Sequence, residues 1–211
     1  MNHIFLRVIA PASILIPLVV APVTRKQWSP ALAALFYFLL FSGVINIVST
    51  IMAAHKINNL PLLHLYTAIE FCAFGSFYYL AATAPLVKKG IGILIILFPI
   101  LCLLNTLFLQ PLNQFNSNVR TLEAILVALM SLFYLGRPAA QEKGPWSRDP
   151  CNWVSTGVLL YFSGSLFLFS FANVLIRETS AAAKMVLWNL HGGLVIVMYL
   201  LMTKAYQVCK S

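Results

Sequence analysis

The chain has 211 residues, of which 61% are hydrophobic and 9% are charged, and its mean hydropathy is +0.88. A soluble domain has about a quarter charged residues, so this composition excludes an ordinary soluble protein. The formal net charge of +9 does not indicate nucleic-acid binding, because the basic residues are scattered between apolar runs as topology signals. We therefore expect an all-α, multi-pass membrane protein whose surroundings are the lipid bilayer.

Seven apolar segments are long enough to cross a bilayer, which takes about 20 helical residues. In chain order they cover about 4–23, 31–55, 62–84, 91–110, 119–138, 152–176 and 185–207. The breaks between them are polar or contain proline, and none is long enough to form a soluble domain. The sequence thus predicts a single seven-transmembrane-helix domain over residues 1–211.

The first of these segments contains Pro11, Pro17 and Pro22 and lacks a small-x-small cleavage site. We interpret it as a retained first helix, with a kink allowed by the prolines, rather than as a cleaved signal peptide.

The distribution of positive charge predicts the orientation. With the N-terminus outside and the C-terminus in the cytoplasm, nine Lys and Arg residues fall on the cytoplasmic side and five on the other. This bias has the direction that membrane proteins favour. The nine are Arg25, Lys26, Lys88, Lys89, Arg137, Lys143, Arg148, Lys204 and Lys210, and the five are Arg7, Lys56, Arg120, Arg177 and Lys184.

Polar side chains within the spans gather toward the outer side. The outer halves and rim hold His55, Asn58, Asn59, His64, Tyr66, Asn105, Asn113, Asn118, Arg120, Glu123, Asn173, Arg177, Trp188, Asn189 and His191. The cytoplasmic halves hold mostly Ser, Tyr and apolar residues. This asymmetry predicts a polar pocket that faces outward.

The third span carries Tyr66, Thr67 and Glu70 on one helical face. Glu70 lies about 13 Å below the rim at 1.5 Å per residue, near the bilayer midplane. A carboxylate at that depth is costly, so it must face the bundle interior and be protonated, paired or functional. His64 is about 120° away around the helix and is expected to meet other neighbours.

Other polar positions leave two interpretations open, helix packing or the lining of a cavity. Ser42, Asn46, Ser49 and Thr50 share one face of the second span, and Ser163, Ser170, Asn173 and Arg177 follow the sixth. Glu123 either forms an i,i+3 ion pair with Arg120 at the interface or turns inward to join Glu70. The predicted ligand pocket consists of Asn46, Tyr66, Thr67, Glu70, Glu123, Asn173, Trp188 and His191.

A metal site, a haem site and a proton relay are more specific alternatives to the polar ligand pocket. They would draw on His64, His191, Glu70 and Glu123, but no H-x-x-x-H or H-E-x-x-H pattern is present. A plain interfacial histidine is the commoner outcome, so we expect no metal and no cofactor.

The stretch N-N-L-P-L-L-H-L-Y-T-A-I-E-F at residues 58–71, followed by F-Y-Y, resembles a group of seven-helix integral membrane proteins of Bacteroidota-type bacteria. The resemblance covers mainly the second and third spans and implies membrane class without an established activity.

The leading hypothesis is a multi-pass protein of the bacterial inner (cytoplasmic) membrane that binds a small polar ligand or ion. As a sensor it would signal through a separate cytoplasmic or membrane partner. A small-solute or proton-coupled transporter is the first alternative, and an intramembrane metal- or carboxylate-dependent lipid hydrolase is the second. The sequence does not decide whether the protein is an enzyme, although it favours a protein without catalytic activity.

Overall fold

The computed structural model describes residues 4–138 and 144–209, apart from the side chain of Arg7. Lys143 and Lys210, which enter the predicted charge distribution, lie outside these residues. All regular elements in the described part are helical. Six of its helices are long and apolar enough to cross a membrane, which confirms the helical, multi-pass architecture. They are α3 (Pro30–Ala54), α4 (Leu60–Ala81), α5 (Pro85–Phe108), α6 (Ser117–Leu135), α7 (Pro150–Glu178) and α8 (Ala181–Val208).

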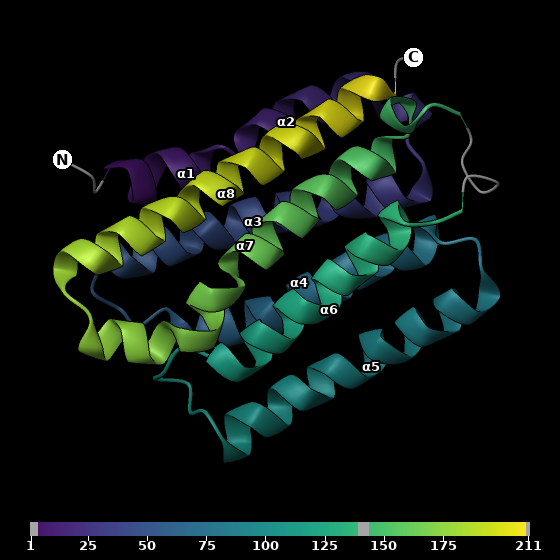
Figure 1. The fold of residues 1–211 in the computed structure, drawn as a ribbon. Coiled ribbons are helices and arrows are strands. Elements are labelled where there is room, and N and C mark those ends of the chain that lie inside the picture. The colour runs from purple at the N-terminus through teal and green to yellow at the C-terminus, as the bar shows by residue number, and fades with distance from the viewer. Residues whose placement is uncertain (1–3, 139–143, 210–211) are drawn as a thin grey trace.

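The N-terminal segment is not one regular α-helix. It consists of a π-helix η1 (Phe5–Ile9), short helices α1 (Ala10–Ala12) and α2 (Leu15–Val20), and a 3₁₀-helix η2 (Ala21–Gln27). Each of its three prolines lacks an N–H and crowds the carbonyl four residues earlier, so the α-helical ladder is interrupted repeatedly. The predicted span 4–23 is therefore a broken helix, and it packs along α8 (Figure 1).

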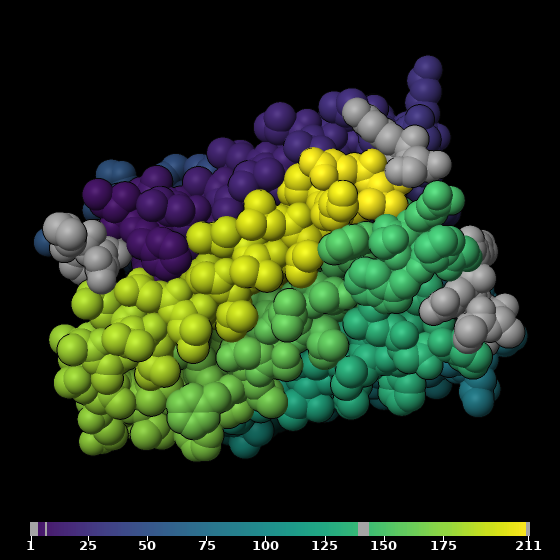
Figure 2. Space-filling model, turned by 45° about the horizontal axis from the view of Figure 1, so that its top comes forward, coloured from purple at the N-terminus to yellow at the C-terminus, as the bar shows by residue number. Residues whose placement is uncertain are grey.

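The two ends of the bundle carry different connections (Figure 1). Near the start of η1 lie the α3–α4, α5–α6 and α7–α8 connections. The opposite end carries the α4–α5 and α6–α7 connections and the end of α8. Figure 2 shows the N-terminal segment, α8, α7 and α6 lying side by side across one face of the molecule.

The helix starts follow from local sequence signals. Ser29, Asp149 and Ser180 cap α3, α7 and α8, their side-chain oxygens accepting hydrogen bonds from backbone N–H groups at 3.3, 2.8 and 3.3 Å. Asp149 also binds Arg137 of the α6–α7 connection at 2.6 Å. These contacts set where α7 begins, and α7 runs from there into the bundle interior.

The centre of the bundle is an apolar layer. Phe74, Val127, Val158 and Phe162 are all 0% exposed, and the rings of Phe74 and Phe162 meet edge to face at 5.5 Å between centroids. Large apolar side chains also cover the outside, as in Phe133, which is 74% exposed. An apolar exterior of this extent suits contact with lipid.

The close contact between α7 and α8 depends on Gly157. A Cβ at this position would lie 3.1 Å from the Cβ of Leu201 and 3.2 Å from the carbonyl oxygen of Met198. Because that carbonyl belongs to the α8 backbone and cannot rotate away, Gly157→Ala is expected to lower the free energy of unfolding by about 1 to 3 kcal/mol. Denaturant titration of the purified protein in detergent measures this change.

Gly90 of α5 provides the matched control, since nothing lies within 4 Å of a Cβ built there. Gly90→Ala is expected to be neutral or slightly stabilising, because alanine is the better helix former by roughly 0.5 to 1 kcal/mol. Equal stability changes in the two variants would contradict the close helix packing at Gly157.

Candidate functional site

A cavity of about 550 Å³ opens among the N-terminal segment, α3, α4 and α8, with α6 and α7 contributing to its floor. It runs from Asn59, just before α4, to Glu70, which is about 16 Å along a helix. Its lining consists of Leu6, Ala10, Pro11, Ile45, Asn46, Ser49, Asn59, Leu62, Leu63, Tyr66, Glu70, Arg120, Tyr161, Trp188, His191, Gly192, Val195, Met198 and Tyr199. The cavity thus lies in the half of the bundle near the start of η1.

Three charged side chains meet at the floor of this cavity. Nη1 of Arg120 donates to a carboxylate oxygen of Glu70 and, at 2.6 Å, to Oε2 of Glu123. Nη2 of Arg120 donates to the hydroxyl of Tyr161 at 3.1 Å. The side chains of Arg120, Glu70 and Glu123 are only 6%, 4% and 0% exposed. We call these three residues the charged triad.

Aromatic rings and hydroxyls hold the charged triad in place. The guanidinium of Arg120 lies 4.6 Å from the ring centroid of Phe169 and 5.9 Å from that of Phe162, within cation–π range. Tyr66 donates to Oε1 of Glu70 at 3.1 Å, and its oxygen lies 3.1 Å from the hydroxyl of Ser42 on α3. Charge interactions between side chains this buried are stronger than in water, so these contacts fix the position of the triad.

Several lining groups keep unused hydrogen-bonding capacity. Within the described residues, no hydrogen bond engages the side-chain amide of Asn46, the indole N–H of Trp188 or the hydroxyl of Tyr199. Nδ1 of His191 lies 2.8 Å from the hydroxyl of Ser165, which leaves Nε2 without a partner in the same set. Polar groups with free donors and acceptors on a cavity wall are what a bound ligand or water would engage.

The predicted pocket residues divide into two groups. Five of them, Asn46, Tyr66, Glu70, Trp188 and His191, line the cavity, and three do not. Glu123 lies behind Arg120 as seen from the cavity. It forms the i,i+3 ion pair with Arg120 and also turns inward to join Glu70, so both interpretations of its position apply. Whether any of these residues binds a ligand stays a prediction.

Thr67 and Asn173 take part in packing instead. Thr67 accepts a hydrogen bond from the amide of Asn116 at 2.8 Å. Asn173 donates to the carbonyl of Phe115 at 2.9 Å and to Ser117 at 3.1 Å. Both therefore hold the connection between α5 and α6 against the bundle.

Arg120 enters the sequence-based expectations twice, as an outer-side charge that predicts the orientation and as an i,i+3 partner of Glu123. The ion pair is present, but the side chain is buried in the triad and is not an exposed charge at the rim. Without Arg120, the predicted orientation has nine Lys and Arg residues on the cytoplasmic side and four, rather than five, on the outer side. In the sequence, the i,i+3 spacing of Arg120 and Glu123 was the feature that indicated their ion pair. Tyr161 and Tyr199 also line the cavity, but no feature of the sequence pointed to them.

His64 is separate from the other proposed metal ligands. Its Nδ1 and Nε2 each lie 3.0 Å from a partner, the hydroxyl of Thr106 and the carbonyl of Gln114. It faces α5 and the α5–α6 connection, as its angular offset from Glu70 predicts. In the described part of the chain, no three His, Cys, Asp or Glu residues are grouped to hold a metal ion. The convergence that the lipid-hydrolase hypothesis requires does not occur around His64.

A second, smaller polar cluster lies on the far side of the apolar layer. The hydroxyls of Tyr78 on α4 and Ser131 on α6 are 2.7 Å apart. Ser155 on α7 is fully buried, and its hydroxyl has no partner in the described residues. The layer of Phe74, Val127, Val158 and Phe162 therefore separates two polar regions of the bundle interior.

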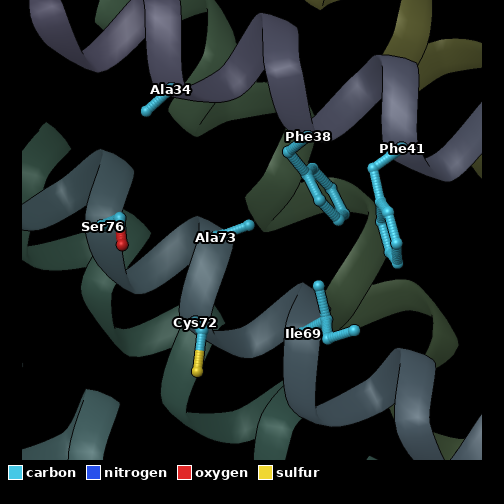
Figure 3. Close-up of a pocket in the computed structure, with 7 residues that line it drawn as sticks. All are labelled: Ala34, Phe38, Phe41, Ile69, Cys72, Ala73 and Ser76. Atoms are coloured by element: carbon cyan, nitrogen blue, oxygen red, sulfur yellow. The ribbon is translucent and has the colours of Figure 1, made fainter.

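A further groove, of about 320 Å³, lies between α3 and α4. Figure 3 shows Phe38 and Phe41 of α3 pointing toward Ile69 and Ala73 of α4. Its lining also includes Ala34, Cys72 and Ser76 and contains no charged side chain. With so few polar groups the groove offers little chemistry, and the 550 Å³ cavity is the better candidate site.

Comparison of the chain with protein-family models, with curated proteins and with solved structures finds no match.

Proposed function

We propose that this protein crosses the bacterial cytoplasmic membrane seven times and binds a small ligand in the 550 Å³ cavity, which opens outward. The broken N-terminal helix would be the first crossing, since it accompanies α8 between the two ends of the bundle (Figure 1). The excess of Lys and Arg at the end that carries η2 and the α4–α5 and α6–α7 connections supports a cytoplasmic location for that end. The N-terminus and the mouth of the cavity would then lie outside.

The observation that carries this proposal is the placement of the charged triad at the floor of the cavity. Ionised side chains inside a membrane bundle are rare and expensive, and they commonly mark functional sites. Here Glu70 and Arg120 reach the cavity lining, and unused polar groups of Asn46, Trp188 and Tyr199 surround the same space. A purely structural ion pair would not require an adjoining cavity of this size.

Binding and sensing fit the bundle better than transport. The apolar layer below Glu123 contains four side chains that are 0% exposed, so the polar path from the outside ends at the triad. As a sensor, the protein would change its helix positions on ligand binding and pass the signal to a separate cytoplasmic or membrane partner.

A transporter is the second candidate, and the inner polar cluster favours it. Tyr78, Ser131 and Ser155 could form the cytoplasmic half of a pathway if Phe74 and Phe162 moved apart. Uptake of a bound compound into proteoliposomes would assign transport rather than sensing.

Filling the cavity is expected to abolish ligand binding. Val195 lines the cavity, so Val195→Trp places a large ring inside it. In a thermal-unfolding screen of small amines, alcohols, carboxylates and sugars, at least one class should stabilise the wild type. At a concentration 100 times Kd this amounts to about 2.7 kcal/mol, and Val195→Trp should lose it.

Val197 lies on the same helix but is 40% exposed, so Val197→Trp is the control and should keep the full stabilisation. If no class stabilises the wild type, or if Val195→Trp retains the effect, ligand binding in this cavity is contradicted.

A further inference from the structure

With both carboxyl groups ionised, the charged triad carries one negative charge in excess. Both Glu70 and Glu123 bind Nη1 of Arg120, so two carboxylates share a single guanidinium. No second Lys or Arg is among the described side chains that line the cavity. Uncompensated charge inside a membrane bundle is costly, and a cation bound next to Glu70 would offset it.

Arg120 is poorly placed to receive an anionic ligand. Its Nη1 serves two carboxylates, its Nη2 donates to Tyr161, and the ring of Phe169 covers its face at 4.6 Å. Glu70, in contrast, accepts one hydrogen bond at Oε1, from Tyr66. Each carboxylate oxygen has about two acceptor sites, so Glu70 can take further donors from the cavity.

The aromatic composition of the wall also favours a cation. Tyr66, Tyr161, Trp188 and Tyr199 all line the cavity together with Glu70, and ring faces attract positive charge at distances of up to about 6 Å. Tyr199 is only 7% exposed, yet its hydroxyl has no partner in the described part of the chain. Since Tyr199 lines the cavity, this hydroxyl is available to a ligand.

The remaining wall and the size of the cavity indicate an organic ligand rather than an inorganic ion. Leu63, Val195 and Met198 form apolar parts of the lining, which suit hydrocarbon and offer no oxygen ligands to a metal. The volume of about 550 Å³ falls in the range of small-molecule sites, about 300 to 1,000 Å³.

Building on the proposed ligand-binding function, we infer that the cavity takes a monovalent organic cation, an ammonium group attached to a short apolar body. The ammonium donates hydrogen bonds to Glu70 and lies among the aromatic rings of the wall. The apolar body packs against Leu62 and Leu63 of α4, which lie between Glu70 and the outer end of that helix.

A series of three probes that share one phenyl-alkyl body tests this inference. The cation is 2-phenylethylammonium, the neutral compound is 2-phenylethanol, and the anion is 3-phenylpropanoate. Equilibrium binding is measured with the full chain in nanodiscs of phosphatidylcholine, so that the lipid carries no net charge. The ammonium is expected to bind at least tenfold more tightly than the alcohol, and the carboxylate more weakly than either.

The variant Glu70→Gln tests whether the preference for the ammonium over the alcohol depends on the Glu70 carboxylate. The variant keeps the size of the side chain and leaves one carboxylate, Glu123, for Arg120, so the bundle is expected to fold. Its affinity for the ammonium should fall at least tenfold while its affinity for the alcohol stays unchanged. Glu178, an exposed carboxylate at the end of α7, is the control, and Glu178→Gln should bind all three probes like the wild type.

The outcomes separate this inference from the proposed function. Equal binding of alcohol and ammonium, tighter binding of the carboxylate, or an unchanged preference in Glu70→Gln would overturn the cation assignment. The same holds if no probe binds while an alcohol, a sugar or a carboxylate of the screen stabilises the wild type but not Val195→Trp. In all of these cases the cavity would remain a binding site. If no compound stabilises the wild type more than Val195→Trp, both the ligand-binding function and the cation assignment are overturned.

Discussion

Arg120→Met is expected to lower the free energy of unfolding by about 3 to 5 kcal/mol. Methionine retains most of the side-chain length but removes the single positive charge that Glu70 and Glu123 share. Both carboxyl groups are almost completely buried, and losing one partner of a buried ion pair leaves an uncompensated buried charge. Denaturant titration in detergent, with circular dichroism as the signal, measures the change.

A compensating variant shows whether the effect is electrostatic. Adding Glu70→Gln and Glu123→Gln to Arg120→Met removes all three charges together, and a neutral replacement of a buried ionic group is often well tolerated. The triple variant should therefore regain most of the lost stability. Arg177→Met, at an exposed position near the end of α7, should change little. A stable Arg120→Met single variant would show that the triad does not hold the bundle together.

Phe162→Ala is expected to destabilise the bundle by about 3 to 5 kcal/mol, the usual cost of deleting a buried aromatic ring. Phe162 is 0% exposed and contacts Phe74 edge to face at 5.5 Å, Tyr161 at 4.8 Å and the guanidinium of Arg120 at 5.9 Å. Its removal leaves a void in the apolar layer that lies between the two polar regions.

Phe167 offers the matched control, because it lies on the same helix and is 58% exposed. Phe167→Ala removes the same atoms from the outer surface, so thermal unfolding in detergent should shift far less than for Phe162→Ala. Similar shifts would mean that the apolar layer is not tightly packed around Phe162.

Much of the architecture could be predicted from local sequence. A membrane helix satisfies its backbone hydrogen bonds within its own segment, so hydropathy and breaks place the ends of α3 to α8 within four residues. The exception is the start of α5, which lies at Pro85 rather than near residue 91. The N-terminal segment shows the limit of that reasoning. Its apolar length suggests a helix with a kink, but Pro11, Pro17 and Pro22 divide it into π-, α- and 3₁₀-helical pieces.

The candidate site was only partly predictable. Burial of Glu70 follows from the cost of a carboxylate near the midplane, and helical spacing puts Tyr66 on the same face. Spacing alone does not distinguish Tyr66 from its neighbour Thr67, since both lie near that face. In the structure Tyr66 reaches the cavity, whereas Thr67 binds Asn116. The choice depends on which helix packs against each side chain.

The membrane class, six of the helices and the need for an inward-facing Glu70 follow from the sequence, because hydropathy and the cost of burying charge act locally. The partner of Glu70, in contrast, depends on how the helices pack. Arg120 lies 50 residues away on another helix, and the crossing of α4 and α6 brings the two side chains together. The same packing buries Glu123, turns His64 away and leaves the cavity open above the triad.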